Sequence, residues 1–212
     1  MFKKIYSNLT KIIILLLLFL LLILTSSISY VTAVNQNISD SVFRLHIIAN
    51  SDSVEDQNLK YKVRDNIISY IKDMNFSSKN DVVSYMTSNQ DLLKKIAKDT
   101  IIQNGYDYNV NISIGNFHFP TKYYGDISLP TGNYDALKIE IGNAIGQNWW
   151  CVMFPPLCFV DVTSGIVPDE SKEYLEENLD LEEYQLISTS TADSDIEVKF
   201  KIVEIINSII NN

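Results

Sequence analysis

Histidine and cysteine are scarce in this chain, which limits the chemistry that it can perform. Its 212 residues include two histidines, His46 and His118, and two cysteines, Cys151 and Cys158. A closed zinc site takes four nitrogen or sulfur ligands, and no ligand spacing joins these four residues. We therefore expect no metal site, and no sequence pattern indicates a cofactor.

Basic residues are also few. The chain has 17 Lys and Arg residues against 26 Asp and Glu residues, which gives a formal net charge of −9, and it has no basic block outside the N-terminus. Proteins that bind nucleic acids do so largely by neutralising phosphates with Lys and Arg. The acidic balance therefore excludes a nucleic acid as the expected partner.

Acidic residues are missing from the first 33 positions. Lys3, Lys4 and Lys11 precede an unbroken apolar run from Ile12 to Leu24. A positively charged start before a short apolar run is typical of a secretory signal peptide, and the charge distribution favours export of the rest of the chain. We expect residues 1–33 to direct export and to provide the only membrane contact.

Two fates of this segment stay open. The small residues Val31 and Ala33 favour cleavage after Ala33, which would leave a secreted protein. Alternatively, Ile28 and Tyr30 extend the apolar run, so that residues 12–31 could serve as a tilted membrane anchor.

The remaining sequence is long enough for one domain with a real core. We expect a polar linker over residues 34–41 and a single domain over residues 42–212. From Asp161 to Glu197 the only basic residue is Lys172, so the C-terminal segment is strongly acidic.

The first part of the domain reads as a strand, a polar turn and a helix. Alternation over Phe43–Ile48 places Phe43, Leu45 and Ile47 on one face and Arg44 and His46 on the other. The turn formers Asn50, Ser51 and Asp52 follow. Ser53 and Asp56 have the spacing of a capping box, which predicts a helix start. The helix then carries an apolar stripe of Leu59, Val63, Ile67 and Ile71, with Lys60, Lys62, Arg64 and Asp65 on its flanks and outer face.

Two more helices and several strands follow. Capping-box spacing predicts a helix from Ser78, and a third helix runs from about Asp91 to Asn104-Gly105. Alternation predicts strands over Tyr106–Ile114 and through Leu137 to Ile141, with a turn-rich surface loop over residues 115–133 between them.

The second of these strands is expected to form a hairpin with the run that starts at Trp149, because Gly142-Asn143 through Gly146 suits a turn. Pro155-Pro156 must then lie at an edge, a bend or an exit, since proline cannot donate ladder hydrogen bonds. A short helix over residues 169–179 and an amphipathic helix from Ile196 to Ile210 complete the chain. This order favours an α+β fold with helices on one face of a mainly antiparallel sheet.

The cysteines allow two interpretations. Export permits a disulfide between Cys151 and Cys158. Their apolar surroundings equally suit reduced, buried thiols. An exported hydrolase that uses a cysteine or Ser51 as nucleophile with His46 is the alternative function, but no nucleophile motif surrounds any of these residues, and we assign no catalytic residue.

Arg44 and His46 are expected to bond to the carboxylates of the nearby turn, namely those of Asp52, Glu55 or Asp56. The aromatic residues allow two interpretations. Trp149 and Phe159 are expected in the core, whereas Trp150 and Phe154 suit either the core or an exposed partner-binding patch, because adjacent strand residues face opposite sides.

Three stretches resemble the stage II sporulation protein R family of endospore-forming bacteria. They are residues 43–65, the segment Gly115–Gly125 together with Leu129–Tyr134, and the block Asn148–Asp161 with its Trp-Trp-Cys and Pro-Pro-Leu-Cys sequences. The order of the three stretches also matches, over about residues 42–162.

The resemblance implies a non-enzymatic signalling protein that is exported from the forespore into the space facing the mother cell. Its implied partner is a membrane-embedded aspartic protease of the mother cell, which processes the precursor of sporulation sigma factor E. We predict that the partner-binding residues come from the polar end of the first strand, the central segment and the aromatic block: Arg44, His46, Asn50, Ser51, Asp52, His118, Lys122, Tyr124, Trp150 and Phe154.

Overall fold

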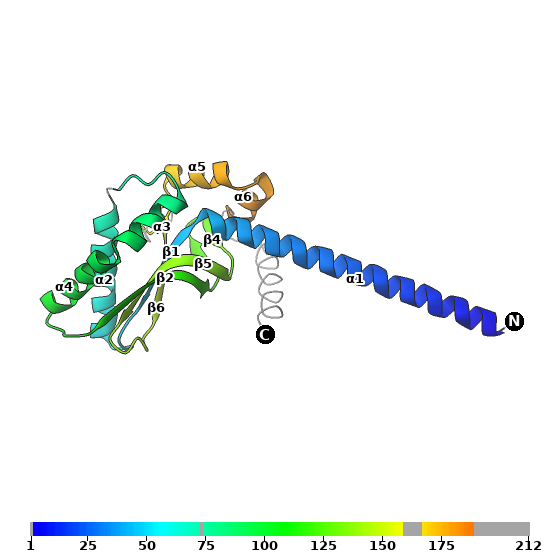
Figure 1. The fold of residues 1–212 in the computed structure, drawn as a ribbon, viewed down its shortest axis with the longest axis horizontal. Helices are drawn as coiled ribbons and strands as arrows, with labels where there is room; N and C mark the ends of the chain where they lie inside the picture. Colours follow the sequence, from blue (N-terminus) through cyan, green and yellow to red (C-terminus); the bar gives the residue numbers. More distant parts are fainter. Residues whose placement is uncertain (1, 73, 159–166, 189–212) are drawn as a thin grey trace.

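The structure, a computed structural model, describes residues 2–72, 74–158 and 167–188 (Figure 1). The expected helix from Ile196 to Ile210 and the expected core residue Phe159 lie outside these ranges. The elements are α1 (Phe2–Ser41), β1 (Phe43–Ile48), α2 (Val54–Ile71), α3 (Lys79–Ser88), α4 (Gln90–Gln103), β2 (Val110–Phe119), β3 (Lys122–Tyr124), β4 (Ile127–Leu129), β5 (Gly132–Ile141), β6 (Asn148–Phe154), α5 (Asp169–Asn178) and α6 (Leu181–Ile187).

A four-stranded sheet in the order β2-β5-β1-β6 forms the centre of the domain. β2 pairs with β5 and β1 pairs with β6 in antiparallel fashion, whereas β1 and β5 are parallel. The predicted α+β class is confirmed. The sheet is mixed rather than purely antiparallel, because one pairing is parallel.

The hairpin expected between β5 and β6 is wrong. β1 lies between these two strands, so residues 142–147 cross the end of β1 instead of forming a tight turn. The glycines that suggested a hairpin allow close approach to the chain after β1. A Cβ at Gly142 would lie 2.2 Å from Asn50 Oδ1, and one at Gly146 would lie 2.2 Å from the Ser51 carbonyl oxygen.

The central strands differ in extent from the sequence prediction. β2 begins at Val110 rather than Tyr106 and continues to Phe119, through Gly115-Asn116, because it pairs with β5 along its whole length. Tertiary pairing thus outweighs the local turn preference. Within the expected loop, β3 and β4 form a separate two-stranded sheet that turns at Gly125, where φ is +60°.

Three helices, α2, α3 and α4, cover one face of the sheet (Figure 1). Phe43, Leu45 and Ile47 are fully buried there, as the alternation predicts, and the α2 stripe is buried as well. The predicted helix starts are confirmed, since Ser53 Oγ accepts from the Asp56 amide and Ser78 Oγ accepts from the Asp81 amide. Burial of this apolar surface is the main stabilising contribution of the layer.

A second, smaller layer packs on the opposite face. It combines the end of α1 with β3, β4, α5 and α6, and it buries Ile38, Leu129, Leu175 and Ile187. Residues 34–41, expected as a polar linker, are therefore the last turns of α1. Val34, Ile38 and Val42 have four-residue spacing, which gives this polar-looking segment one apolar stripe.

The apolar part of α1 extends away from the domain (Figure 1). Ile12–Leu24 is exposed along its length, and the helix is long and apolar enough to cross a membrane. A signal sequence has the same properties, so an export or membrane segment is supported without a choice between the two.

We predict that the crossing at residues 142–147 fails when Gly146 gains a side chain. Gly146→Ala places a Cβ against the Ser51 backbone, which should lower the free energy of unfolding by about 2 kcal/mol and the melting temperature by about 4–8 °C. Gly115→Ala is the matched control, because its Cβ would meet the Phe117 ring at an ordinary 3.7 Å. Equal melting temperatures for the two variants would contradict the close approach.

Candidate functional site

The three segments that carry the sequence resemblance meet on the face of β1 that holds Arg44 and His46. β1 contributes both residues, β6 lies beside them through the pairs His46–Trp150 and Arg44–Val152, and the central segment supplies Phe119, Tyr124 and Tyr134. Residues far apart in the sequence thus form one continuous cluster.

Arg44 is fully buried in an aromatic cage. Its guanidinium carbon lies 4.1 Å from the centre of the Phe119 ring and 4.6 Å from that of Tyr134, and Nη2 donates to the Tyr124 hydroxyl at 2.7 Å. Cation–π attraction at these distances stabilises the buried charge. Burial raises the pKa of both tyrosines, and the neighbouring arginine opposes that rise only in part.

The expectation that Arg44 and His46 bond to the turn carboxylates is wrong. β1 carries both side chains onto the sheet face, where their neighbours are aromatic, while Asn50 and Ser51 bond to Asp56 instead. Within the described ranges Nε and Nη1 of Arg44 have no hydrogen-bond partner.

His46 is stacked on Trp150, with ring centroids 3.7 Å apart and an interplanar angle of 19°. It is 7% exposed, and its Nε2 lies 2.7 Å from Asn148 Oδ1, so the protonated nitrogen donates to this amide oxygen. Nδ1 is buried without a partner in the part of the chain that the structure describes. Burial lowers the pKa of His46, Lys138 and Arg44 lower it further, and the Asn148 bond opposes them. The imidazole is therefore held neutral.

A partly exposed region of the sheet lies beside His46. We call it the open sheet face and define it by His46, Lys138, Glu140, Asn148 and Trp150, which are neighbours in the strand register. Trp150 is half-buried, Asn148 is exposed, and Lys138 pairs with Glu140 at 3.0 Å. An apolar ring flanked by both charge signs is the composition of many protein-binding surfaces.

Asn50, Ser51 and Asp52 follow the C-terminal end of β1 and hold the crossing at residues 142–147. Asn50 Oδ1 accepts from the Asn143 amide at 2.9 Å, and Asp52 Oδ1 accepts from the Gln147 amide at 2.7 Å. Ser51 donates its hydroxyl to Asp56, which anchors the turn to α2. These polar side chains close the fold locally, in addition to any role with a partner.

Asp56 and Lys60 of α2 also take part in holding the crossing, together with Asn50, Ser51 and Asp52. Burial raises the pKa of Asp56, but bonds from Ser51, Asn50 and Tyr108 outweigh it and hold the pKa below its usual value. Lys60, expected on the helix flank, is 1% exposed and donates to the Gln147 carbonyl at 2.9 Å. Sequence periodicity could not reveal that contact, because it depends on the crossing.

The other predicted partner-binding residues lie apart. His118 is exposed and contacts Asn133 and Thr131, and Lys122 is half-buried on β3. Phe154 is 7% exposed and packs edge-on against Tyr174 of α5, with ring centroids 4.6 Å apart. Trp149 faces α2, where Arg64 lies 4.4 Å from its ring centre. The structure thus brings together Arg44, His46, Tyr124 and Trp150 but not the whole predicted set.

A disulfide joins Cys151 to Cys158, so the alternative that both are free thiols is wrong. The hydrogen-bond and ring partners of His46 in the described ranges are Asn148, Trp150 and Phe119, none of which is a nucleophile. Among these residues no group of three or more His, Cys, Asp or Glu side chains is arranged to hold a metal ion.

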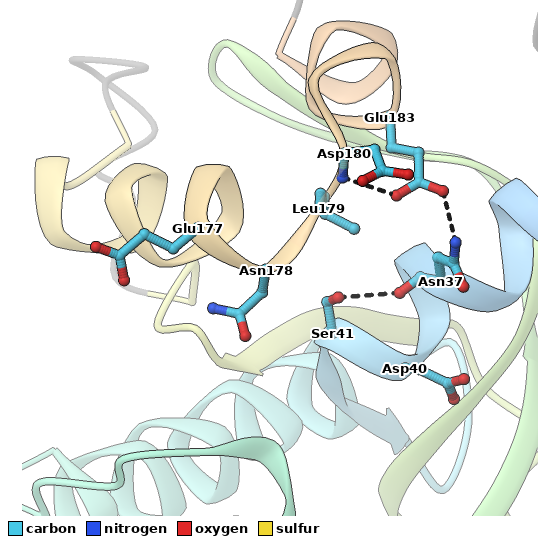
Figure 2. A pocket seen from close by; sticks show the side chains of 8 residues that line it. All are labelled: Asn37, Asp40, Ser41, Glu177, Asn178, Leu179, Asp180 and Glu183. Atoms are coloured by element: carbon cyan, nitrogen blue, oxygen red, sulfur yellow. Dashed lines mark hydrogen bonds between the residues drawn. The ribbon is translucent and has the colours of Figure 1, made fainter.

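A cleft of about 380 Å³ lies between the end of α1 and the α5–α6 corner (Figure 2). Figure 2 shows Asn37 reaching Glu183, and its Nδ2 donates to the carboxylate at 2.7 Å. Glu183 also accepts from the Asp180 amide in a capping box at the start of α6. The cleft is therefore the seam where α1 docks on the domain.

Comparisons with known proteins agree with the sequence resemblance. The family model described as stage II sporulation protein R matches residues 39–164. The protein of that name from Bacillus subtilis (strain 168) is 39% identical over 140 residues, which are 64% of this chain and 62% of that protein. The match thus spans less than two thirds of that relative. No solved structure is significantly similar.

The buried imidazole predicts a pH dependence of stability. The pKa of His46 is lowered in the folded chain, so the unfolded chain binds the proton more tightly. The neutral imidazole therefore favours the folded state fully above about pH 6.5, and this contribution to the free energy of unfolding decreases as the pH falls below that value. Denaturant unfolding between pH 5.5 and pH 7.5 should show stability rising with pH, by at most about 1.4 kcal/mol per pH unit.

His46→Gln should remove most of this slope. The chain has one other histidine, His118, which is exposed and provides the control in His118→Gln. If the slope survives in His46→Gln, or disappears in His118→Gln, the buried imidazole is not its source.

Proposed function

The chain belongs to the stage II sporulation protein R family, and on that premise we propose that it is an exported signal that activates a membrane-embedded aspartic protease. Its role in sporulation follows from the family. The proposed activity is narrower: export from the forespore into the space facing the mother cell, and activation there of the protease that processes the sigma factor E precursor.

The N-terminal helix supports export. Its exposed apolar run, Ile12–Leu24, follows Lys11 and joins the domain through the packed segment around Ile38. A domain that follows such a segment is carried across the membrane, and a disulfide is typical of an oxidising compartment.

The open sheet face supports a binding function. An activator must bind the active state of its target more tightly than the inactive state, so it needs a surface of fixed shape. Trp150 provides such a surface, because stacking on the buried His46 fixes its ring, while the side chain is only partly buried. Tryptophan is among the residues most enriched at the energetic anchors of interfaces. This fixed, accessible Trp150 is the observation that carries the proposal.

A hydrolase is less well supported. The cysteines are joined, and the Ser51 hydroxyl donates to Asp56 beyond the end of the strand that carries His46. A nucleophile needs a base within hydrogen-bond reach, and His46 instead bonds to an amide. We therefore propose that the chain itself carries no catalytic residue.

We predict that Trp150→Ala strongly reduces activation. The full chain, the membrane protease and the sigma factor precursor are reconstituted in membranes, and precursor cleavage is measured. Loss of the anchor should reduce the cleavage rate at least tenfold, which corresponds to about 1.4 kcal/mol of binding.

Trp149→Ala is the matched control, because the two tryptophans are adjacent and half-buried but Trp149 faces α2. Both variants should lose similar stability, and only Trp150→Ala should lose activation. Equal effects on cleavage would assign Trp150 a purely structural role, and the absence of any cleavage dependent on the wild-type chain would overturn the proposed function.

A further inference from the structure

Two highly exposed large apolar side chains lie at one end of the domain. Ile145, in the crossing at residues 142–147, is 74% exposed, and Val54, at the start of α2, is 71% exposed. Among residues 10–72, 74–158 and 167–188, no other large apolar side chain is as exposed. Isolated surface aliphatic residues are ordinary. These two residues come from adjoining segments, because the Ile145 amide donates a hydrogen bond to the carbonyl of Asn50, which is four residues before Val54.

The backbone that carries Ile145 is unusually well fixed. Every amide from residue 142 to residue 147 donates a hydrogen bond. Gly142 donates to the Asn109 carbonyl, Ala144 to Ile141, Ile145 to Asn50 and Gly146 to Ala49. The Asn143 and Gln147 amides donate to the side chains of Asn50 and Asp52. A surface loop with all its amides bonded to the protein is held in one conformation, which lowers the entropic cost of binding.

The same segment holds a residue in an unfavourable conformation. Ala144 has φ +52°, and it is the only residue other than glycine with positive φ in the described ranges. Such conformations cost free energy and persist where surrounding contacts impose them. Here the imposed turn directs the next side chain, Ile145, into solvent.

Charge around this end is acidic. Asp52 and Glu55 are exposed next to Val54. Lys60 is buried beneath the crossing, and Arg64, further along α2, lies against Trp149 and pairs with Asp65 at 2.7 Å. Anionic membrane surfaces repel such a border, while a protein surface with lysine or arginine attracts it.

We propose that Ile145 and Val54 form an apolar tip that inserts into an apolar socket, bordered by lysine or arginine, on the extracytoplasmic surface of the partner protein. The inference rests on the proposed function, which makes the membrane protease that partner. α1 joins the opposite end of β1 (Figure 1). A chain held by α1 in one membrane therefore presents the tip away from that membrane.

Capture between two sets of nanodiscs tests this proposal. The full chain is held in one set through α1 and immobilised, and the protease is supplied in a second set. Ile145→Ser and Val54→Ser should each weaken capture at least tenfold, and Glu55→Lys should weaken it about threefold. Ile102→Ser is the control, because Ile102 is an exposed isoleucine on α4, and it should remain within twofold of wild type. Melting temperatures establish that all variants are folded.

The outcomes separate this proposal from the proposed function. If a folded Ile145→Ser variant captures the protease as well as the wild-type chain does, the proposed apolar tip is wrong. This holds even where Trp150→Ala abolishes cleavage and the activator function stands. Loss of capture in Ile145→Ser without any stimulated cleavage supports the tip and overturns activation. Capture by protease-free nanodiscs that depends on Ile145 assigns the tip to a membrane and overturns the protein socket. No capture of the protease by the wild-type chain overturns both.

Discussion

The rest of the structure depends on the crossing of residues 142–147 over the end of β1. Because the chain passes there, β1 pairs with β5 on one side and with β6 on the other, and becomes a central strand. The side chains of Asn50 and Asp52 accept hydrogen bonds from backbone amides of the crossing, and Gly146 leaves room for the Ser51 carbonyl. The polar residues after β1 therefore determine which strands are neighbours, and hence which side chains share each face.

That neighbour order creates the candidate site. With β6 beside β1, Trp150 lies next to His46, and with β5 on the other side, Lys138 joins the same row. Arg44 then lies where the aromatic rings of the central segment close over it. The buried arginine and histidine stiffen the sheet beneath a tryptophan that stays partly in solvent. This rigidity suits a surface that must discriminate between two states of a partner.

Local patterns were sufficient for much of the fold. The burial of Phe43, the stripe of α2 and the Ser53 and Ser78 caps all follow from spacing that acts within one element. The hairpin was wrong because a glycine-rich turn and a glycine-rich crossing look alike in sequence, and the cage around Arg44 depends on β3, whose position no local pattern gives. The family resemblance indicated which segments matter, while the three-dimensional pairing showed that they touch.

The central claim is that the open sheet face contacts the membrane protease directly. Photocrosslinking tests it, with benzoylphenylalanine placed at Trp150, where an aromatic side chain is retained, and at Trp149 as the adjacent position on the opposite face. After irradiation of the reconstituted membranes, we expect a covalent adduct with the protease from position 150 and little from position 149. An adduct from position 149 alone, or none from either position while precursor cleavage proceeds, would contradict direct contact through this face.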